Sequence, residues 1–141
     1  MFGVSPNRAS AYSQVGMETG VTSADPHKLI LMLFDGAIMA ITTASAAMER
    51  NDIPAKGMAI SRAIEIIANG LDACLDHEAG GELAQRLSAL YDYMTERLIH
   101  ANLHNSRETL DEVVQILSGL RESWQAIAPK TGSAPAEDPQ P

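Results

Sequence analysis

The chain has 141 residues, of which 45% are hydrophobic and only 4% aromatic, so it suits one globular domain with a core of aliphatic side chains and alanine. Its net charge of −8 argues against nucleic acid as a partner, because phosphate binding needs clustered lysine and arginine. No apolar run approaches the ~20 residues of a bilayer span, and the N-terminus lacks the regions of a secretory signal. We therefore expect a soluble protein without direct membrane insertion.

Residues 1–24 place glycine and proline among small polar side chains and show no sustained period. They predict a loose N-terminal arm. Its apolar anchors are Tyr12 and Val15, which one helical turn would place side by side.

A first helix is predicted from Pro26 to about Glu49, because Asp25 can cap its free N–H groups and Pro26 suits its first position. Six apolar residues recur at spacings of four and three, which predicts a core stripe. They are Ile30, Phe34, Ala37, Ile41, Ala44 and Met48.

Two further helices are predicted downstream. The second begins near Pro54 and ends before Ala79-Gly80-Gly81, where two glycines favour a tight reversal. The third runs from Glu82 to about His104. The core stripe of the second contains Ile60, Ile64, Ile67, Leu71, Cys74 and Leu75, and that of the third contains Leu83, Leu87, Leu90, Tyr91, Met94, Leu98 and Ala101.

A fourth helix is predicted after Asn105 and Glu108, which have the spacing of a capping box, and Pro129 closes it. Four amphipathic helices joined by short turns predict an all-α, antiparallel up-down four-helix bundle. The expected organisation is an arm (1–24), a bundle domain (25–128) and a disordered, proline-rich tail (129–141) without apolar anchors.

Motifs of catalysis and metal binding are absent from the sequence as far as spacing shows. His100 and His104 have the i, i+4 spacing of a zinc helix but lack the glutamate of His-Glu-x-x-His, and no Glu-x-x-His is present. The single cysteine, Cys74, permits no internal disulfide and suits a reducing cytoplasm. We expect neither enzyme activity nor a cofactor or metal.

Surplus apolar side chains outside the core stripes are the remaining signal. They either pack around the rim of the bundle or line a groove for an amphipathic helix, where methionines adapt to the partner's shape. They are Leu31, Met32, Ile38 and Met39 on the first helix, Ile66 on the second, and Tyr93, Ile99 and Leu103 on the third.

An ordered set of short motifs resembles the FliS family of flagellar export chaperones over about residues 11–128. Two positions depart from the family pattern: Asp25 stands where serine is expected, and Phe34 stands where tyrosine is usual. The motifs are Ala11-Tyr12 with Val15, the run from Asp25 to Ala37 (DPHKLILMLFDGA), Gly80-Gly81-Glu82-Leu83-Ala84, Leu90-Tyr91-Asp92-Tyr93-Met94, Leu98 with Ala101-Asn102, and Leu120-Arg121 with Trp124.

The resemblance implies a helical bundle in the bacterial cytosol that binds the disordered C-terminal segment of flagellin, prevents its premature polymerisation and supports its export by the flagellar type III secretion system. It also implies a second partner, the membrane protein of the flagellar export gate, and an arm around Tyr12 that covers part of the groove and moves when the client binds. With the surplus apolar residues, the expected partner-binding set is Tyr12, Val15, Leu31, Met32, Phe34, Ile38, Met39, Ile66, Tyr93, Ile99 and Leu103.

Two other classes of protein remain open from the sequence. One is a helical regulatory adapter, or a homodimer, that uses the same apolar flank. The other is a metal-binding or redox bundle, which metal analysis of the purified protein would identify.

Overall fold

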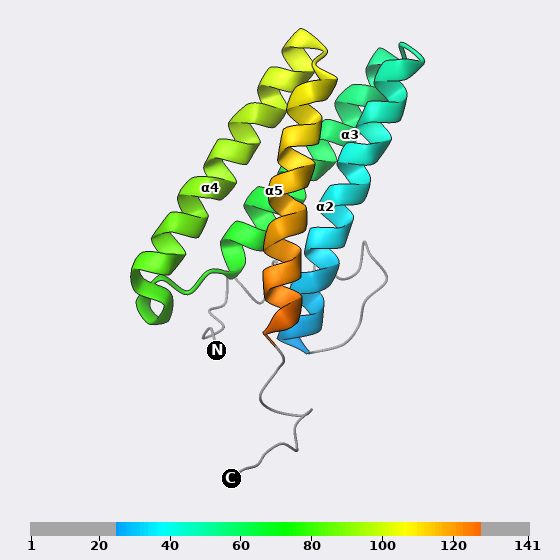
Figure 1. The fold of residues 1–141 in the computed structure, drawn as a ribbon. Helices are drawn as coiled ribbons and strands as arrows, with labels where there is room; N and C mark the ends of the chain where they lie inside the picture. The colour runs from blue at the N-terminus through cyan, green and yellow to red at the C-terminus, as the bar shows by residue number, and fades with distance from the viewer. Residues whose placement is uncertain (1–24, 128–141) are drawn as a thin grey trace.

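A computed structural model describes residues 25–127, which form four helices that run alternately up and down (Figure 1). The predicted all-α, antiparallel four-helix bundle is confirmed. The predicted arm and tail lie outside the described residues. The helices are α2 (Pro26–Glu49), α3 (Ile53–Glu65), α4 (His77–His104) and α5 (Arg107–Ala126).

Helix α2 supplies a large part of the core and packs against both α3 and α5. Asp25 caps it as predicted, because its carboxylate accepts a hydrogen bond from the His27 N–H at 3.1 Å. By length and composition α2 could cross a membrane, but the core helix of a soluble protein passes the same test. All six residues of its predicted core stripe are buried.

The second helix departs from regular α geometry below α3. It continues as a π-helical segment, η1 (Ile66–Leu71), and a short 3-10 turn, η2 (Asp72–Cys74). A π turn holds more residues than an α turn, so it shifts which side chains face the core. Ile66 and Ile67 are therefore both buried, with 1% and 0% of their surfaces exposed. The prediction that Ile66 lies outside the core stripe is wrong.

The boundary between the second and third helices lies earlier than predicted. Helix α4 begins at His77, where the Asp76 carboxylate accepts hydrogen bonds from two backbone N–H groups at 3.1 Å. Gly81 then interrupts the helix with φ 54° and ψ −128°, a conformation that favours glycine. Beyond this kink Leu83, which was expected on the core stripe, is 65% exposed.

The last turn between helices also differs from its prediction. Asn105 adopts the left-handed conformation with φ 52° and ends α4, a role that asparagine tolerates well. Ser106 caps α5 instead, since its hydroxyl accepts from the Thr109 N–H at 3.2 Å. The capping box expected at Asn105 and Glu108 is therefore wrong by one residue.

A buried lysine ties α3 to the end of α4. The Lys56 Nζ donates to the Asn102 carbonyl at 3.0 Å and to the Asn105 side-chain oxygen at 3.1 Å. Its positive charge complements the carbonyl end of the α4 dipole. This contact fixes the end of the bundle at which α3 begins and α4 finishes.

Candidate functional site

An open groove runs between α2 and α3, with a volume of about 640 Å³. Small residues form much of its lining, and Met39 and Met58 are 69% and 75% exposed. We call it the α2–α3 groove. Its lining residues are Met32, Asp35, Gly36, Met39, Ala40 and Thr43 of α2, and Ala55, Met58, Ala59 and Arg62 of α3.

Side-chain size explains how the groove forms. Gly36 lies close to the second helix, because an added Cβ would be 3.4 Å from the Cδ1 atom of Ile66. Asp35, which also lines the groove, is paired with Arg121. Its carboxylate accepts hydrogen bonds from Arg121 Nε at 2.5 Å and from Arg121 Nη2 at 3.3 Å. The groove therefore offers mainly apolar surface between charged residues.

A second cavity of about 350 Å³ lies among α2, α4, α5 and the segment below α3. We call it the basal pocket. The lower ends of α4 and α5 diverge around it (Figure 1). Its lining is apolar apart from the hydroxyl groups of a tyrosine and a serine: Ile30, Phe34, Leu71, Cys74, Leu75, Gly80, Leu83, Ala84, Leu87, Tyr91, Leu120, Ser123, Trp124 and Ile127.

Tyr91 is the buried polar residue of this pocket. Burial raises the pKa of its hydroxyl far above the usual range, and the nearby Asp72 carboxyl raises it further. The hydroxyl therefore stays protonated at every physiological pH. It gives the pocket one neutral hydrogen-bonding group rather than an acid or a nucleophile.

The predicted partner-binding residues of the first helix fall into three environments. Met32 and Met39 line the α2–α3 groove together. Leu31 and Ile38 are half-buried, and Ile38 packs against the core. Phe34 is a core residue whose ring also lines the basal pocket, so it has no exposed face on the outer surface of the bundle.

The remaining predicted residues are not brought together with these. Ile66 belongs to the core, and Tyr12 and Val15 lie outside the described residues. Ile99 and Leu103 are exposed on α4, and they line neither the groove nor the pocket.

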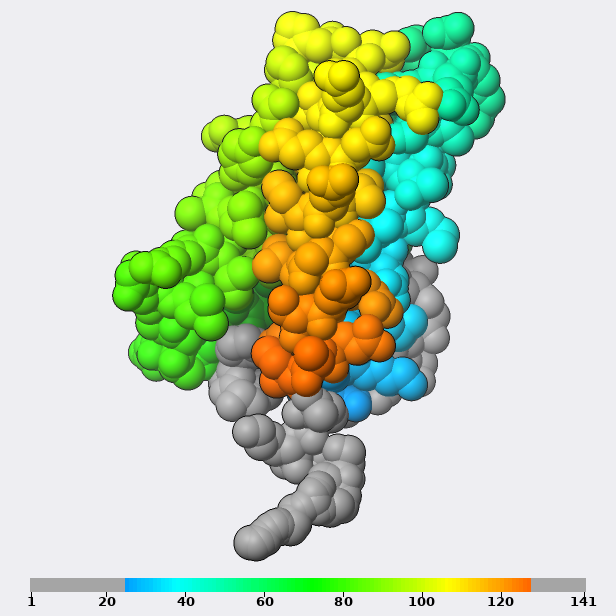
Figure 2. All heavy atoms as spheres, viewed as in Figure 1, coloured from blue at the N-terminus to red at the C-terminus, as the bar shows by residue number. Residues whose placement is uncertain are grey.

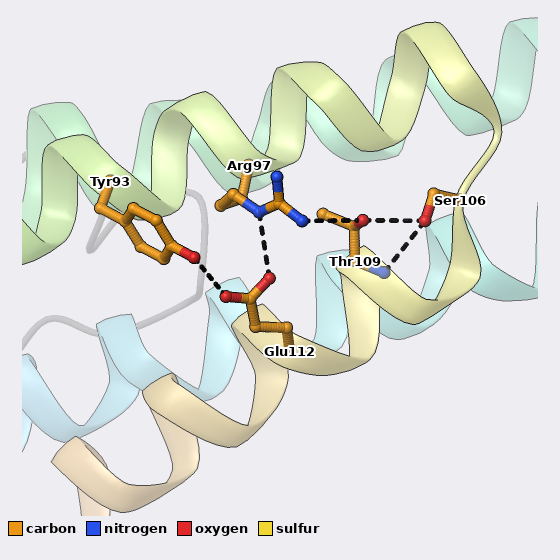
Figure 3. A network of polar contacts seen from close by, with 5 residues as sticks. All are labelled: Tyr93, Arg97, Ser106, Thr109 and Glu112. Atoms are coloured by element: carbon orange, nitrogen blue, oxygen red, sulfur yellow. Dashed lines mark hydrogen bonds and ion pairs between the residues drawn. The ribbon is translucent and has the colours of Figure 1, made fainter.

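Tyr93 takes part in a polar network between α4 and α5 (Figure 3). Its hydroxyl donates to Glu112, which also accepts from Arg97 Nε at 3.0 Å. These hydrogen bonds lower the pKa of Glu112 and raise that of Tyr93. Tyr93 therefore bridges two helices of the free protein.

Sequence reasoning missed most of the basal pocket and the α3 side of the groove. Met58 carried a usable signal, because it lies two positions from the core residue Ile60 and so on another face of the helix. The pocket carried none, since its walls come from segments as far apart as Ile30 and Ile127.

The described part of the chain offers no set of metal ligands. Within residues 25–127, no group of three or more histidine, cysteine, aspartate or glutamate side chains is placed to hold a metal ion. The rings of His100 and His104 lie 4.3 Å apart, which makes a pair at most.

Comparison with known proteins shows the family to which the chain belongs. The family described as "Flagellar protein FliS" matches residues 8–131. The chain is 53% identical over 120 residues to the flagellar secretion chaperone FliS of Salmonella typhimurium, covering 85% of this chain and 89% of that protein. It is 45% identical over 117 residues to FliSB of Pseudomonas aeruginosa (83% and 92%) and 35% identical over 122 residues to FliS of Bacillus subtilis (86% and 86%). The chain belongs to the FliS family of flagellar secretion chaperones.

Proposed function

We propose that this protein binds the C-terminal segment of flagellin in the bacterial cytosol, prevents its premature polymerisation and supports its export by the flagellar type III secretion system. Three relatives are named flagellar secretion chaperones, which supports the class of activity. The α2–α3 groove is the observation that supports an amphipathic helix as the client. A chaperone of this kind needs no nucleotide, because binding alone masks the client.

The groove has the properties that a helix-binding site requires. Its small floor residues allow close approach of a second backbone, and its exposed methionines adapt to side chains of different shapes. A disordered client loses conformational entropy when it becomes ordered in the groove, and the burial of its apolar area offsets that loss. We therefore place the amphipathic client helix in the α2–α3 groove.

The N-terminal arm, residues 1–24, joins the bundle at Asp25, and His27, two residues further along α2, contacts Trp124 in the wall of the basal pocket. We propose that the arm around Tyr12 covers part of the client groove and moves when the client binds. The membrane protein of the export gate is a further proposed partner. The position of the arm would tell it whether the chaperone has bound its client.

Titration calorimetry with a flagellin C-terminal segment tests the proposal. We expect 1:1 binding without nucleotide and a negative heat-capacity change, because apolar surface becomes buried. Circular dichroism should show added helix in the complex. Flagellin that lacks this segment is the control, and equal binding of the truncated flagellin would contradict the proposal.

Removal of residues 1–17 should change flagellin affinity while the bundle stays folded, because residues 25–127 form a buried core to which all four helices contribute. A competing arm would raise affinity when removed, and a clamping arm would lower it. Calorimetry measures the affinity, and the melting temperature checks the fold. An affinity equal to that of the full chain would deny the arm a role in binding.

A further inference from the structure

The methionines of the described part of the chain divide into two groups by exposure. Met39 and Met58 are 69% and 75% exposed, and they come from opposite walls of the α2–α3 groove, where Met32 is half-buried. Met48 and Met94 are core residues with 5% and 0% of their surfaces exposed. Figure 2 shows the surface of α2 along the right-hand edge of the bundle, with α5 between it and α4. The methionines that this part of the chain exposes to solvent therefore lie in the groove.

The thioether groups are the oxidisable groups of the groove lining. A thioether sulfur attacks one oxygen of hydrogen peroxide, so an S–O bond forms, the O–O bond breaks, and the second oxygen leaves with the peroxide protons as water. The sulfur is oxidised and the peroxide is reduced. The product, methionine sulfoxide, is polar and chiral, whereas the parent side chain is apolar and flexible. The only cysteine of the sequence, Cys74, is 2% exposed, so its thiol is shielded from peroxide in the folded protein.

We propose that Met39 and Met58 are a reversible oxidation site, at which peroxide makes the α2–α3 groove polar and lowers its affinity for the client. This inference rests on the placement of the client helix in that groove, as proposed above. In the free chaperone a sulfoxide oxygen stays hydrated, because both side chains are largely exposed. Beneath a docked apolar surface the same oxygen would lose its water without gaining a hydrogen-bond donor, which weakens binding. Methionine sulfoxide reductases convert the sulfoxide back to the thioether and so restore the groove.

Oxidation of the full, folded chain with hydrogen peroxide tests which methionines react. Peptide mass spectrometry with fragmentation follows the gain of one oxygen atom at each position. We expect Met39 and Met58 to react at least about tenfold faster than Met48 and Met94, which the folded core protects. A flagellin C-terminal segment added before the peroxide should slow the reaction at Met39 and Met58. Equal rates at the exposed and the buried positions would overturn the proposal.

Calorimetry with the flagellin segment measures the effect of oxidation on binding. The peroxide is removed before the segment is added, so that only the chaperone is oxidised. We expect the oxidised parent to bind about tenfold more weakly, or weaker still, while its melting temperature stays within a few degrees of that of the reduced parent. Treatment with reductases for both sulfoxide epimers should restore the affinity. An oxidised parent that binds as tightly as the reduced one would refute the regulation.

Met39→Leu combined with Met58→Leu is the matched control, because leucine keeps the groove apolar and has no sulfur to oxidise. This variant retains the other methionines of the sequence, including Met1 and Met17, which lie outside the described residues. Its affinity should be the same before and after peroxide treatment, and a loss equal to that of the parent would place the effect elsewhere and overturn the proposal. A reduced parent that does not bind the segment would refute the proposed function and this regulation with it. A parent that binds equally well in both states refutes the regulation alone.

Discussion

Ile41→Asp is expected to unfold the bundle. Ile41 lies midway along α2 with none of its surface exposed, on the stripe that packs against α3 and α5. A carboxylate there would lose its hydration without gaining a partner, a penalty of several kcal/mol even if it is protonated. Because a small domain has about 5–15 kcal/mol of stability in all, this change removes much or all of it. Far-UV circular dichroism during heating and urea titration measures the loss.

Two control variants show whether the effect comes from burial. Ile41→Val removes one methylene group at the same position and should lower the free energy of unfolding by only about 0.5–1.5 kcal/mol. Met39→Asp places the same carboxylate two residues earlier, where the side chain is 69% exposed, and should fold normally. A folded Ile41→Asp protein that melts within a few degrees of the parent would show that this stripe does not form the core.

The stripe of α2 was predictable because nothing interrupts the helix. With 3.6 residues per turn from Pro26 to Glu49, spacing alone determines which side chains share a face. The second helix breaks this rule at Ile66, where the π-helical turn adds a residue. Nothing in the apolar spacing indicates that turn, and with it both Ile66 and Ile67 are buried in the core.

Helix ends were predictable where one residue has a single role. Asp25 followed by Pro26 and an apolar run indicates a helix start, and the structure has it there. Gly81 and Asn105 are different, because both adopt left-handed backbone conformations that suit either a reversal or a kink. The sequence placed the reversal at the glycines, whereas Asp76 caps α4 five residues earlier.

The residues of the candidate site show the same difference between local spacing, which was predictable, and packing, which was not. Met32 and Met39 were predicted because they lie off the core stripe of one helix, a property of local spacing. Phe34 was also expected to bind a partner, yet it faces inward to the basal pocket. That pocket lies where α4 and α5 diverge, and its walls come from segments that are far apart in the sequence.

Met39→Asp combined with Met58→Asp should abolish most flagellin binding without unfolding the protein. The two side chains come from opposite walls of the α2–α3 groove, and both are largely exposed before binding. Their carboxylates would stay hydrated in the free chaperone and lose water only beneath the docked helix. At about 1–2 kcal/mol for each desolvated group, affinity should fall roughly 30-fold to 1,000-fold. Ile38→Asp tests this less cleanly, because Ile38 also packs against the core.

Ile99→Asp combined with Leu103→Asp is the control that decides which apolar surface receives the client. These α4 residues have the same exposed, apolar character and were predicted from the same kind of spacing, but they lie outside the groove. Their double variant should bind flagellin as the parent does, and a Met39→Leu, Met58→Leu protein should retain binding because it keeps the groove apolar. Calorimetry on all three proteins gives the comparison. If the α4 variant loses affinity and the groove variant keeps it, the client helix lies along α4, and the α2–α3 groove is left without this role.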